Sequence, residues 1–373
     1  MSFQSTFKGR RVLVTGDTGF KGAWLCEWLL AEGAEVYGLG LKPDTEPALF
    51  ERLELESRIH HSELDIRDAC ALRDYFTNTD PEIVLHLAAQ PLVRLSYEIP
   101  VETYATNVMG TVHVLDAIRQ NAGSVEHPIA AVLITTDKCY ENREWLHSYR
   151  EEDPVGGHDP YSSSKGACEL AIDSFRRSYF SREGDRRVAI ASARAGNVIG
   201  GGDWASERIL PDCIRALDSG MPISVRNRFA ARPWQHVLEP LGGYLLLAAE
   251  LWRGLNDQPA VQTRFHYSEL CTAFNFGPSI RSNRPVQELV NEVLKHWDGS
   301  WRDDSDPHAP HEARLLNLSI DKAHHMLGWQ PRWDFETTIC ETVGWYRKYH
   351  KNQSPARELI SFNLERYRRS SME

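Results

Sequence analysis

The sequence predicts an α/β protein in which a doubly wound parallel sheet is joined to a second, smaller mixed α/β lobe. Two observations support this prediction. Between residues 12 and 200, short β-branched runs alternate with longer segments of helical period, which is the pattern of β-crossover-β units in a parallel sheet. After residue 200, prolines recur at short intervals and divide the chain into small elements, which indicates a more irregular lobe.

The expected elements follow from the apolar runs in order. The first strand is expected at 12–15, followed by a glycine turn and a helix over 23–31 that ends at Gly33. Right-handed crossovers between successive strands place helices on both faces of the sheet. Further strands are expected at 35–39, 83–87, 131–135 and 188–192, and late helices at 286–297 and 337–349. We expect the first domain to comprise residues 1–195 and roughly 236–272, and the second to comprise roughly 196–235 and 273–373.

Length, charge and composition exclude several classes of protein. The 373 residues are 42% apolar, which is ample for a packed core. The formal net charge of −10 argues against a nucleic-acid binder, because such proteins need a surplus of Lys and Arg. The longest apolar stretch, 244–249, is far shorter than the ~20 residues that span a bilayer, and no leader precedes the first strand, so we expect no membrane association. Seven cysteines without a C-x-x-C pair predict free thiols and a cytoplasmic location.

The turn after the first strand has glycines at positions 16, 19 and 22. In a Rossmann-type dinucleotide site, the first glycine permits the tight turn, the second admits the pyrophosphate, and the third lets the helix pack closely on the strand. An ordinary surface turn is the alternative, but the flanking strand and helix favour a dinucleotide site.

The adenosine end of this expected site is less clear. The acidic residue that usually binds the ribose is missing after the second strand, where Lys42 stands, so NAD and NADP both remain open. Asp65 and Ile66 follow a possible third strand. They fit an adenine pocket and a solvated turn about equally well.

Asp159 and Pro160 are a good helix start, and they place Tyr161 and Lys165 one turn apart on one helix face. An ammonium ~4 Å from a phenol, at an effective dielectric of ~20, contributes ~4 kcal/mol, or ~3 pKa units. The lysine therefore brings the tyrosine toward the pKa of a general base at working pH. Taken alone, the pair is more often an ordinary amphipathic pair.

Together, the glycine turn and the Tyr–Lys pair resemble the extended short-chain dehydrogenase/reductase family. Further motifs at 86–90, 107–111 and 327–331 extend the resemblance over nearly the whole chain. Within the family, the sequence is most similar to the nucleotide-sugar 4,6-dehydratases because Thr136-Asp137-Lys138 follows a strand at the carboxyl edge of the sheet. The dTDP-glucose members have Thr-Asp-Glu there; the lysine, together with 194–204, resembles members that act on CDP-D-glucose. A dTDP- or GDP-sugar dehydratase, a 4-epimerase and a non-catalytic redox-sensing module remain alternatives.

The resemblance implies a hydro-lyase that converts CDP-D-glucose to CDP-4-dehydro-6-deoxy-D-glucose with NAD. Tyr161 takes the C4 hydroxyl proton while Lys165 holds its charge, and protonated Asp137 acts on the leaving C6 hydroxyl. Lys138 is either the base at C5 or a cation that stabilises the C4 enolate. The implied catalytic residues are Thr136, Asp137, Lys138, Tyr161 and Lys165. The implied cofactor-binding residues are Gly16, Thr18, Gly19, Phe20, Gly22, Asp65, Ile66, Leu87, Ala88, Ala89, Asn107, Thr135, Tyr161 and Lys165, and the implied substrate-binding residues are Gln90, Asn197, Arg208, Arg232 and His236.

The remaining expectations concern metals, assembly and pathway. His60-His61, His324-His325 and His308 with His311 lack Cys or acidic partners at a recognised spacing, so no metal site is expected. The resemblance implies a homodimer or higher homo-oligomer that pairs through the segments around 101–121 and 161–179. It also implies a role in making deoxysugars of surface polysaccharide, such as lipopolysaccharide O-antigen.

Overall fold

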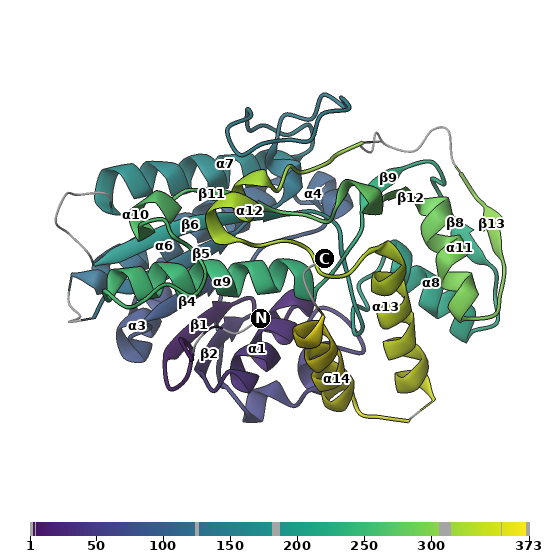
Figure 1. Cartoon of the computed structure of the whole chain (residues 1–373), viewed down its shortest axis with the longest axis horizontal. Helices are drawn as coiled ribbons and strands as arrows, with labels where there is room; N and C mark the ends of the chain where they lie inside the picture. The colour runs from purple at the N-terminus through teal and green to yellow at the C-terminus, as the bar shows by residue number, and fades with distance from the viewer. Residues whose placement is uncertain are drawn as a thin grey trace.

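The computed structural model describes residues 3, 5–123, 127–180, 187–305, 315–351 and 353–370. Its centre is a seven-stranded sheet in the order β11-β6-β5-β4-β1-β2-β3, and every neighbouring pair is parallel (Figure 1). The predicted fold class is confirmed. The strands are β1 (Arg11–Thr15), β2 (Glu35–Gly40), β3 (His60–Glu63), β4 (Ile83–His86), β5 (Ile129–Ile134), β6 (Val188–Ala195) and β11 (Ala273–Phe276).

The five strands predicted with bounds are all present. The possible third strand before Asp65 is β3, for which no bounds were predicted, and the other edge strand, β11, was missed. β3 has the sequence His-His-Ser-Glu and is partly exposed, so it lacks the apolar run that marks a buried strand. β11 lies beside β6 and belongs to the main sheet, which corrects the expected domain boundary near residue 272.

Two apolar layers cover the sheet because successive side chains along each strand point to opposite faces. Val12 and Val14 of β1 pack with α1 (Phe20–Ala31) and α9 (Leu238–Leu255) on one face. Leu13 packs on the other face with helices that complete the second layer. Those helices are α3 (Ala69–Thr79), α6 (Gly110–Ala122) and α7 (Pro160–Phe175).

Short helices connect these layers. They are α2 (Leu49–Arg52), η1 (Leu55–Ser57), α4 (Val93–Glu98), α5 (Pro100–Tyr104), the π-helix η2 (Ala105–Met109), η3 (Asp137–Cys139), the π-helix η4 (Arg176–Phe180), α10 (Tyr267–Leu270) and η5 (Ile280–Ser282). Helix α1 begins three residues earlier than predicted because the glycine turn itself leads into the helix at Phe20.

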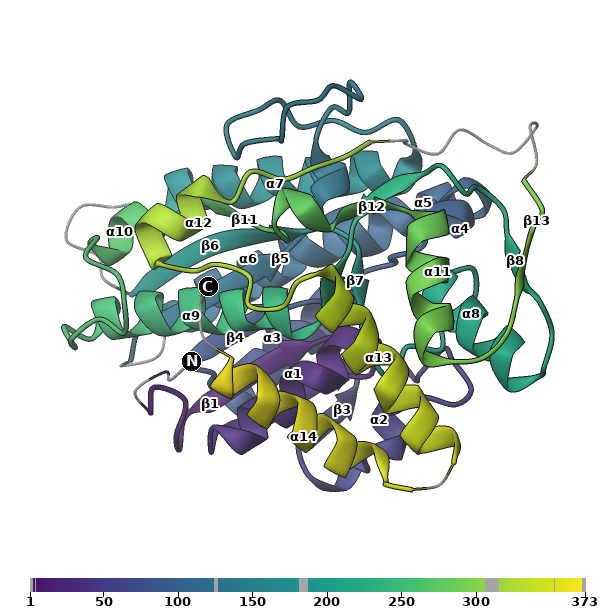
Figure 2. The same ribbon diagram turned by 45° about the vertical axis from the view of Figure 1, so that its right-hand side comes forward.

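The second lobe lies to the right in Figure 1 and consists of small two-stranded pairs with helices around them. The two predicted late helices are present as α11 and α13. The C-terminal helix α14 contacts α1 and α2 (Figure 2), so the end of the chain packs against the first lobe. The elements not yet given, of which α12 lies beside β11 of the main sheet, are β7 (Val198–Ile199), α8 (Ile209–Asp218), β8 (Ile223–Val225), β9 (Ala231–Pro233), β10 (Gln235–His236), β12 (Asn283–Pro285), α11 (Val286–His296), β13 (Trp301–Asp303), α12 (Asp321–Leu327), α13 (Phe335–His350) and α14 (Ala356–Arg369).

Two further expectations can be compared with the described residues. Within them, no helix is both long and apolar enough to cross a bilayer. The seven cysteines all lie in the described part of the chain and all are unpaired.

The lobes are joined closely at Gly201, which lies against the ring of Trp345 on α13. A Cβ at Gly201 would lie 2.1 Å from Trp345 Cδ2, and the Gly201 carbonyl accepts a 2.9 Å hydrogen bond from Trp24 Nε1. Both neighbours are buried. A larger residue at position 201 therefore has no space.

We predict that Gly201→Ala lowers stability by about 1–3 kcal/mol through overpacking. Gly344→Ala is the matched control. Its Cβ would meet nothing within 4 Å in the interior of α13, so it should raise stability by about 1 kcal/mol. The measurement is thermal unfolding of both variants beside the wild type. Equal midpoints for the two variants would contradict the close packing at Gly201.

Candidate active site

In the glycine turn between β1 and α1, a Cβ would clash with the chain's own backbone at two of the three glycines but not at the third. Gly16 has φ +75°, and its Cβ would lie 2.8 Å from the Ala88 backbone; a Cβ at Gly22 would lie 2.0 Å from the Gly16 carbonyl oxygen. A Cβ at Gly19 would meet only that oxygen, at an ordinary 3.4 Å. Gly19 therefore borders an open cradle at the start of α1, which has no side-chain cap. This cradle fits the diphosphate of a dinucleotide.

Near the end of β2, an acidic side chain from the glycine turn packs against the strand. Asp17 is buried against Gly38 and Gly40, and His61 Nδ1 lies 2.6 Å from its Oδ2. Burial raises the pKa of Asp17, although the hydrogen bond from His61 opposes this. Sequence reasoning did not predict this buried contact of Asp17 with His61. The neighbouring Thr18 hydroxyl donates to the Leu41 carbonyl at 2.8 Å.

The expected adenine-binding residues follow β3. The Asp65 carboxylate is held by the Arg67 guanidinium, whose hydrogen bonds lower the pKa of Asp65. Ile66 packs against α6, where a Cβ at Gly110 would lie 2.4 Å from its Cδ1. Ile66 thus packs the segment after β3 against α6. The Asp65 carboxylate is already hydrogen-bonded to Arg67.

The segment after β4, residues 87–90, forms the other wall of the turn. The Ala88 N–H donates to Thr15 Oγ1 at 3.1 Å. The Gln90 side chain bonds to the Leu92 backbone and to Thr103, and buried Asn107 bonds to the Gln90 backbone and to Ser164. Gln90 and Asn107 therefore brace this wall against α7.

The turn after β5 carries the expected acid. The Thr136 hydroxyl donates to Asp137 Oδ1 at 3.0 Å. Asp137 is 2% exposed, and its Oδ2 lacks a hydrogen-bond partner among the described residues. Burial raises the pKa of Asp137, while the charges of Lys138 and Arg232 oppose the rise. Asp137 is therefore suited to hold a proton.

Helix α7 brings the phenol to this turn. Its N-cap Asp159 accepts a 2.8 Å hydrogen bond from the Ser162 N–H, as the sequence predicts. Tyr161 is nearly buried, and a hydrogen bond joins its hydroxyl to Thr136. Burial raises the pKa of Tyr161, and the hydrogen bond and the charge of Arg208 only partly oppose this. The chain alone therefore does not produce the expected lowering, because the cost of burying the phenolate is larger.

Lys165 is also buried, and burial lowers its pKa although Cys168 and Glu169 oppose the shift. A second lysine that sequence reasoning missed, Lys21 in the first turn of α1, lies within electrostatic range of Lys165, Arg208 and Asp137. Burial together with the two cations lowers the pKa of Lys21 to about 8. The sequence signal that could have identified Lys21 as a site residue is its position as a lone lysine in an otherwise apolar helix start.

The second lobe contributes two of the expected cations. Arg208 precedes α8 and pairs with Asp203 at 2.9 Å, and its charge acts on Tyr161. Arg232 on β9 is buried, and its charge acts on Asp137. Asn197 lies between β6 and β7, where its carbonyl accepts from the Gln235 N–H. These three residues therefore lie on the lobe that faces the catalytic turn.

His236 does not fit the expected substrate contact. Its ring is fully buried between Trp24 and Trp333, with ring centroids 5.7 and 4.7 Å away. Burial lowers its pKa to about 3. We therefore correct the expectation: His236 is a neutral core residue.

The described residues contain no group of three or more His, Cys, Asp and Glu side chains arranged for a metal ion. His308 and His311, one of the three histidine pairs considered above, lie outside the described residues.

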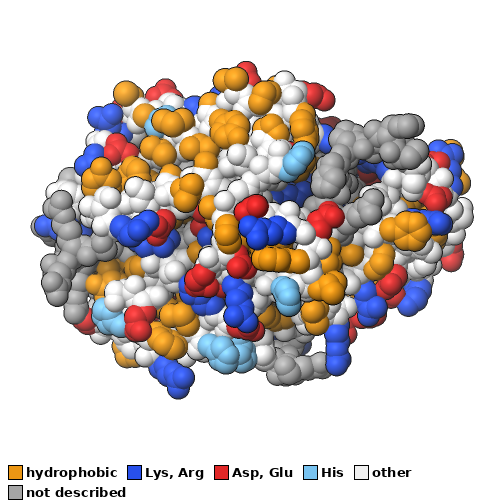
Figure 3. All heavy atoms as spheres, turned by 90° about the horizontal axis from the view of Figure 1, so that it is seen from above, with side chains coloured by type: hydrophobic (Ala, Val, Ile, Leu, Met, Phe, Trp, Pro, Cys, Tyr) orange, Lys and Arg blue, Asp and Glu red, His pale blue; other side chains and the backbone are white. Residues whose placement is uncertain are grey.

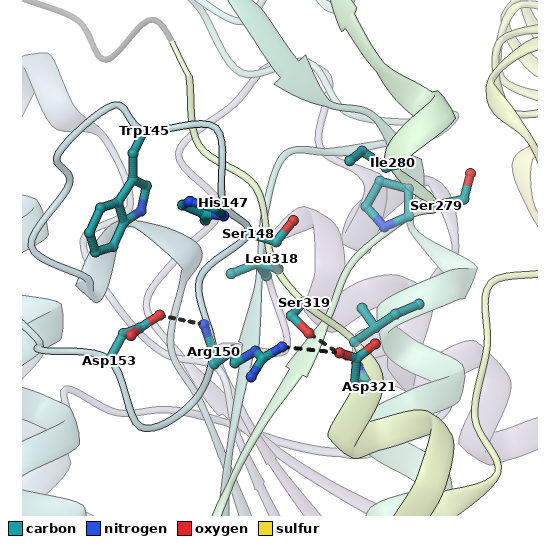
Figure 4. A pocket seen from close by; sticks show the side chains of 12 residues that line it. Trp145, His147, Ser148, Arg150, Asp153, Ser279, Ile280, Leu318, Ser319 and Asp321 are labelled. Atoms are coloured by element: carbon teal, nitrogen blue, oxygen red, sulfur yellow. Dashed lines mark hydrogen bonds and ion pairs between the residues drawn. The ribbon is translucent and has the colours of Figure 1, made fainter.

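A separate pocket of about 550 Å³ lies between the loop that follows the catalytic turn, the end of β11 and the start of α12 (Figure 4). Arg150 and Asp321 face each other there at 4.0 Å, and the Arg150 N–H donates to Asp153 at 2.7 Å. The lining residues are Trp145, His147, Ser148, Arg150, Asp153, Pro278, Ser279, Ile280, Leu318, Ser319, Ile320 and Asp321. None of the expected site residues belongs to this pocket.

Two known proteins similar to this chain are nucleotide-sugar 4,6-dehydratases. A CDP-glucose 4,6-dehydratase from Salmonella typhimurium is 45% identical over 351 residues, which cover 93% of each chain. A dTDP-glucose 4,6-dehydratase from Mycolicibacterium smegmatis is 27% identical and covers 94% of this chain and 97% of its own.

Solved structures share the fold. A dTDP-glucose 4,6-dehydratase from Streptomyces venezuelae, solved with NAD bound, has a TM-score of 0.74 at 22% identity and covers 93% of this chain and 99% of its own. A UDP-glucose 4-epimerase from Thermotoga maritima has a TM-score of 0.73 at 20% identity, with 91% and 99% covered. The model of the family described as GDP-mannose 4,6 dehydratase matches residues 13–342. The chain therefore belongs to this family of extended short-chain dehydrogenases/reductases.

Proposed function

We propose that this chain is an NAD-dependent CDP-D-glucose 4,6-dehydratase, a hydro-lyase that forms CDP-4-dehydro-6-deoxy-D-glucose. The observation that carries the proposal is the meeting of Thr136 and Asp137 with Tyr161 at the carboxyl end of β5. The 45% identity to the Salmonella CDP-glucose 4,6-dehydratase supports the substrate. The open cradle at Gly19 supports the dinucleotide.

Two groups of the chain handle the protons at C4 and C6. Tyr161 accepts the C4 hydroxyl proton, for which its phenol must ionise, and the charge of Arg208 favours that ionisation. Asp137 gives its proton to the departing C6 hydroxyl, because its burial favours the protonated carboxyl. The cradle of residues 16–22 and the wall of residues 87–89 would hold NAD, which would supply the hydride acceptor for C4 and the hydride donor for C6.

Lys138, the lysine of the turn after β5, is assigned the role at C5, from which a proton must be removed. Lys138 follows Asp137 directly in η3 and is only partly buried. It acts at C5 either as the base or as the cation that stabilises the C4 enolate. Lys21 is a second amine in the site, and its lowered pKa of about 8 makes a neutral fraction available near that pH.

The ligands carry diphosphates, so the site needs positive charge although the whole chain has a formal net charge of −10. Arg208 and Arg232 supply it from the second lobe, because a guanidinium can pair with two phosphate oxygens at once. Asn197 adds an amide. The cofactor-binding set contributes the cradle of residues 16–22 and the wall of residues 87–89.

We also propose that the chain forms a homodimer in the cytoplasm and supplies deoxysugars for surface polysaccharide. Figure 3 looks onto the side of the molecule where α4 and α7 lie in Figure 1, and hydrophobic side chains gather there. The two segments expected to pair carry exposed apolar side chains, and so does the neighbouring α4. The exposed residues are Tyr97, Val101, Tyr104, Met109, Leu170 and Tyr179.

The substrate proposal predicts selective formation of a keto sugar. Purified protein should convert CDP-glucose, without added reductant, to a product whose absorbance rises in alkali. Turnover of dTDP-glucose and of GDP-mannose should be lower than turnover of CDP-glucose by a factor of about 10 or more. A ketone-free sugar product would indicate a 4-epimerase, and the absence of any turnover would favour a sensor.

Asp137→Asn should slow elimination by ~10²–10⁴-fold, because the amide cannot give a proton to the leaving hydroxyl. Oxidation at C4 should continue, so reduced nicotinamide should accumulate. The measurement is the rise in its near-ultraviolet absorbance. In the wild type, elimination should decline as pH rises through the raised pKa of Asp137, and the variant should lack this limb. Glu141→Gln, an exposed carboxylate beyond the turn, should behave as wild type. Wild-type turnover in Asp137→Asn would remove the assigned acid.

Leu170→Glu should convert the dimer to a monomer in analytical ultracentrifugation, because Leu170 is 63% exposed on α7 and a charge there opposes burial against a partner. Phe229→Glu is the control, because Phe229 is 71% exposed outside both pairing segments. It should leave the dimer intact. A dimer that survives Leu170→Glu, or a monomeric wild type, would exclude this interface.

A further inference from the structure

A buried carboxylate lies one helical turn after Lys165. Glu169 on α7 is 5% exposed and accepts hydrogen bonds from two strands of the sheet. The Thr135 hydroxyl, at the end of β5, donates to Oε1. On β6, the Ser192 hydroxyl and Arg194 Nη2 donate to Oε2 at 2.8 and 2.9 Å. One side chain therefore joins the helix to both strands.

Arg194 balances this charge and connects it to the loop beyond the catalytic turn. It is 4% exposed, and its Nη1 donates to the Tyr140 hydroxyl at 2.7 Å and to the Glu151 carbonyl at 3.0 Å. The Tyr140 hydroxyl in turn donates to Asn275 Oδ1 on β11 at 2.7 Å. The opposite charge of Arg194 lowers the pKa of Glu169 despite its burial. Glu169 is therefore a charged, fully partnered group in a dry part of the protein.

The position of this pair matters because the acid and the phenol come from different elements. Asp137 belongs to the turn after β5, whereas Tyr161 and Lys165 belong to α7. Thr135 directly precedes Thr136 and Asp137, so its hydrogen bond to Glu169 fixes the strand end that carries the acid against the helix that carries the phenol. Misplacement of reacting groups by about 1 Å can cost ~10²-fold in rate.

We propose that Glu169 is a positioning residue of the active site: held by Arg194, its carboxylate sets the spacing between the Thr136–Asp137 turn and Tyr161. The role rests on the dehydratase function proposed above. Ser192 and Thr135 bind the same carboxylate, but only Thr135 leads into the catalytic turn. Loss of the Thr135 hydrogen bond should therefore disturb catalysis, whereas loss of the similar Ser192 hydrogen bond should not.

Glu169 has a second effect on Lys165. Its negative charge raises the pKa of Lys165 against the lowering by burial. The other titratable groups around Lys165 are Cys168 on the same helix, Cys139 of the turn, Lys21 of α1 and His86 of β4. None of these four groups is a carboxylate, so Glu169 provides the carboxylate charge that acts on Lys165. Without its charge, Lys165 loses its proton at a lower pH.

The experiment compares Thr135→Val with Ser192→Ala. Thr135→Val should lower kcat, expressed per molecule of bound NAD, by about 10–100-fold at unchanged KM for CDP-glucose. Amide exchange at residues 136–138, measured by mass spectrometry, should become faster. Ser192→Ala should keep kcat within about twofold of wild type and leave that exchange unchanged. Equal kcat and equal exchange in the two variants would overturn the proposal.

Glu169→Gln provides a second measurement through the pH profile. In the C4 oxidation step, which precedes the elimination that needs Asp137, Glu169→Gln should move the alkaline limb of the rate to lower pH, whereas Thr135→Val should leave that limb in place. An unmoved limb in a folded Glu169→Gln variant would remove the electrostatic part of the role. If the wild type does not convert CDP-glucose, the proposed function fails, and the exchange data on Thr135→Val and Ser192→Ala still decide the positioning role.

Discussion

The burial of Asp137 and Tyr161 at the junction of β5 and α7 is the constraint on which the rest of the site depends. Taking a carboxyl and a phenol out of water favours their neutral forms, and the pKa values of both are raised here. That shift suits Asp137 as an acid but works against Tyr161 as a base. The site therefore needs positive charge to oppose the burial of the phenol. Arg208 acts on Tyr161 directly, and Lys21 lies within electrostatic range of Arg208, Lys165 and Asp137. The buried Glu169–Arg194 pair then keeps the two reacting elements in register.

The parallel sheet explains why these groups can meet. The carboxyl ends of β1, β4 and β5 lie at one edge, so the glycine turn, the wall of residues 87–90 and the catalytic turn face the same space. The second lobe closes this edge with Arg208 and Arg232, and the packing of Gly201 on Trp345 joins the lobes. Two guanidinium groups thus lie beside the catalytic turn of a chain whose formal net charge is −10.

Much of this arrangement can be predicted from the sequence, for identifiable reasons. The strands with β-branched runs, the glycine turn and the Asp159–Pro160 helix start all have local signals. β3 and β11 lack such signals, because an edge strand is defined by the neighbour it pairs with. The buried position of His236 between two tryptophans, the place of Asp17 against β2 and the approach of Lys21 to Lys165 depend on segments distant in sequence. The direction of the pKa shift of Tyr161 also cannot be predicted from the sequence, because it depends on the balance between burial and neighbouring charge.

The central claim is that one site oxidises C4, eliminates water and returns the same hydride to C6. The most direct measurement uses CDP-glucose carrying deuterium at C4 and follows the label in the product by NMR. The account predicts deuterium at C6 of the 4-keto-6-deoxy sugar, transferred within one molecule, and no net reduced cofactor. Deuterium retained at C4, or found in free reduced cofactor, would contradict it.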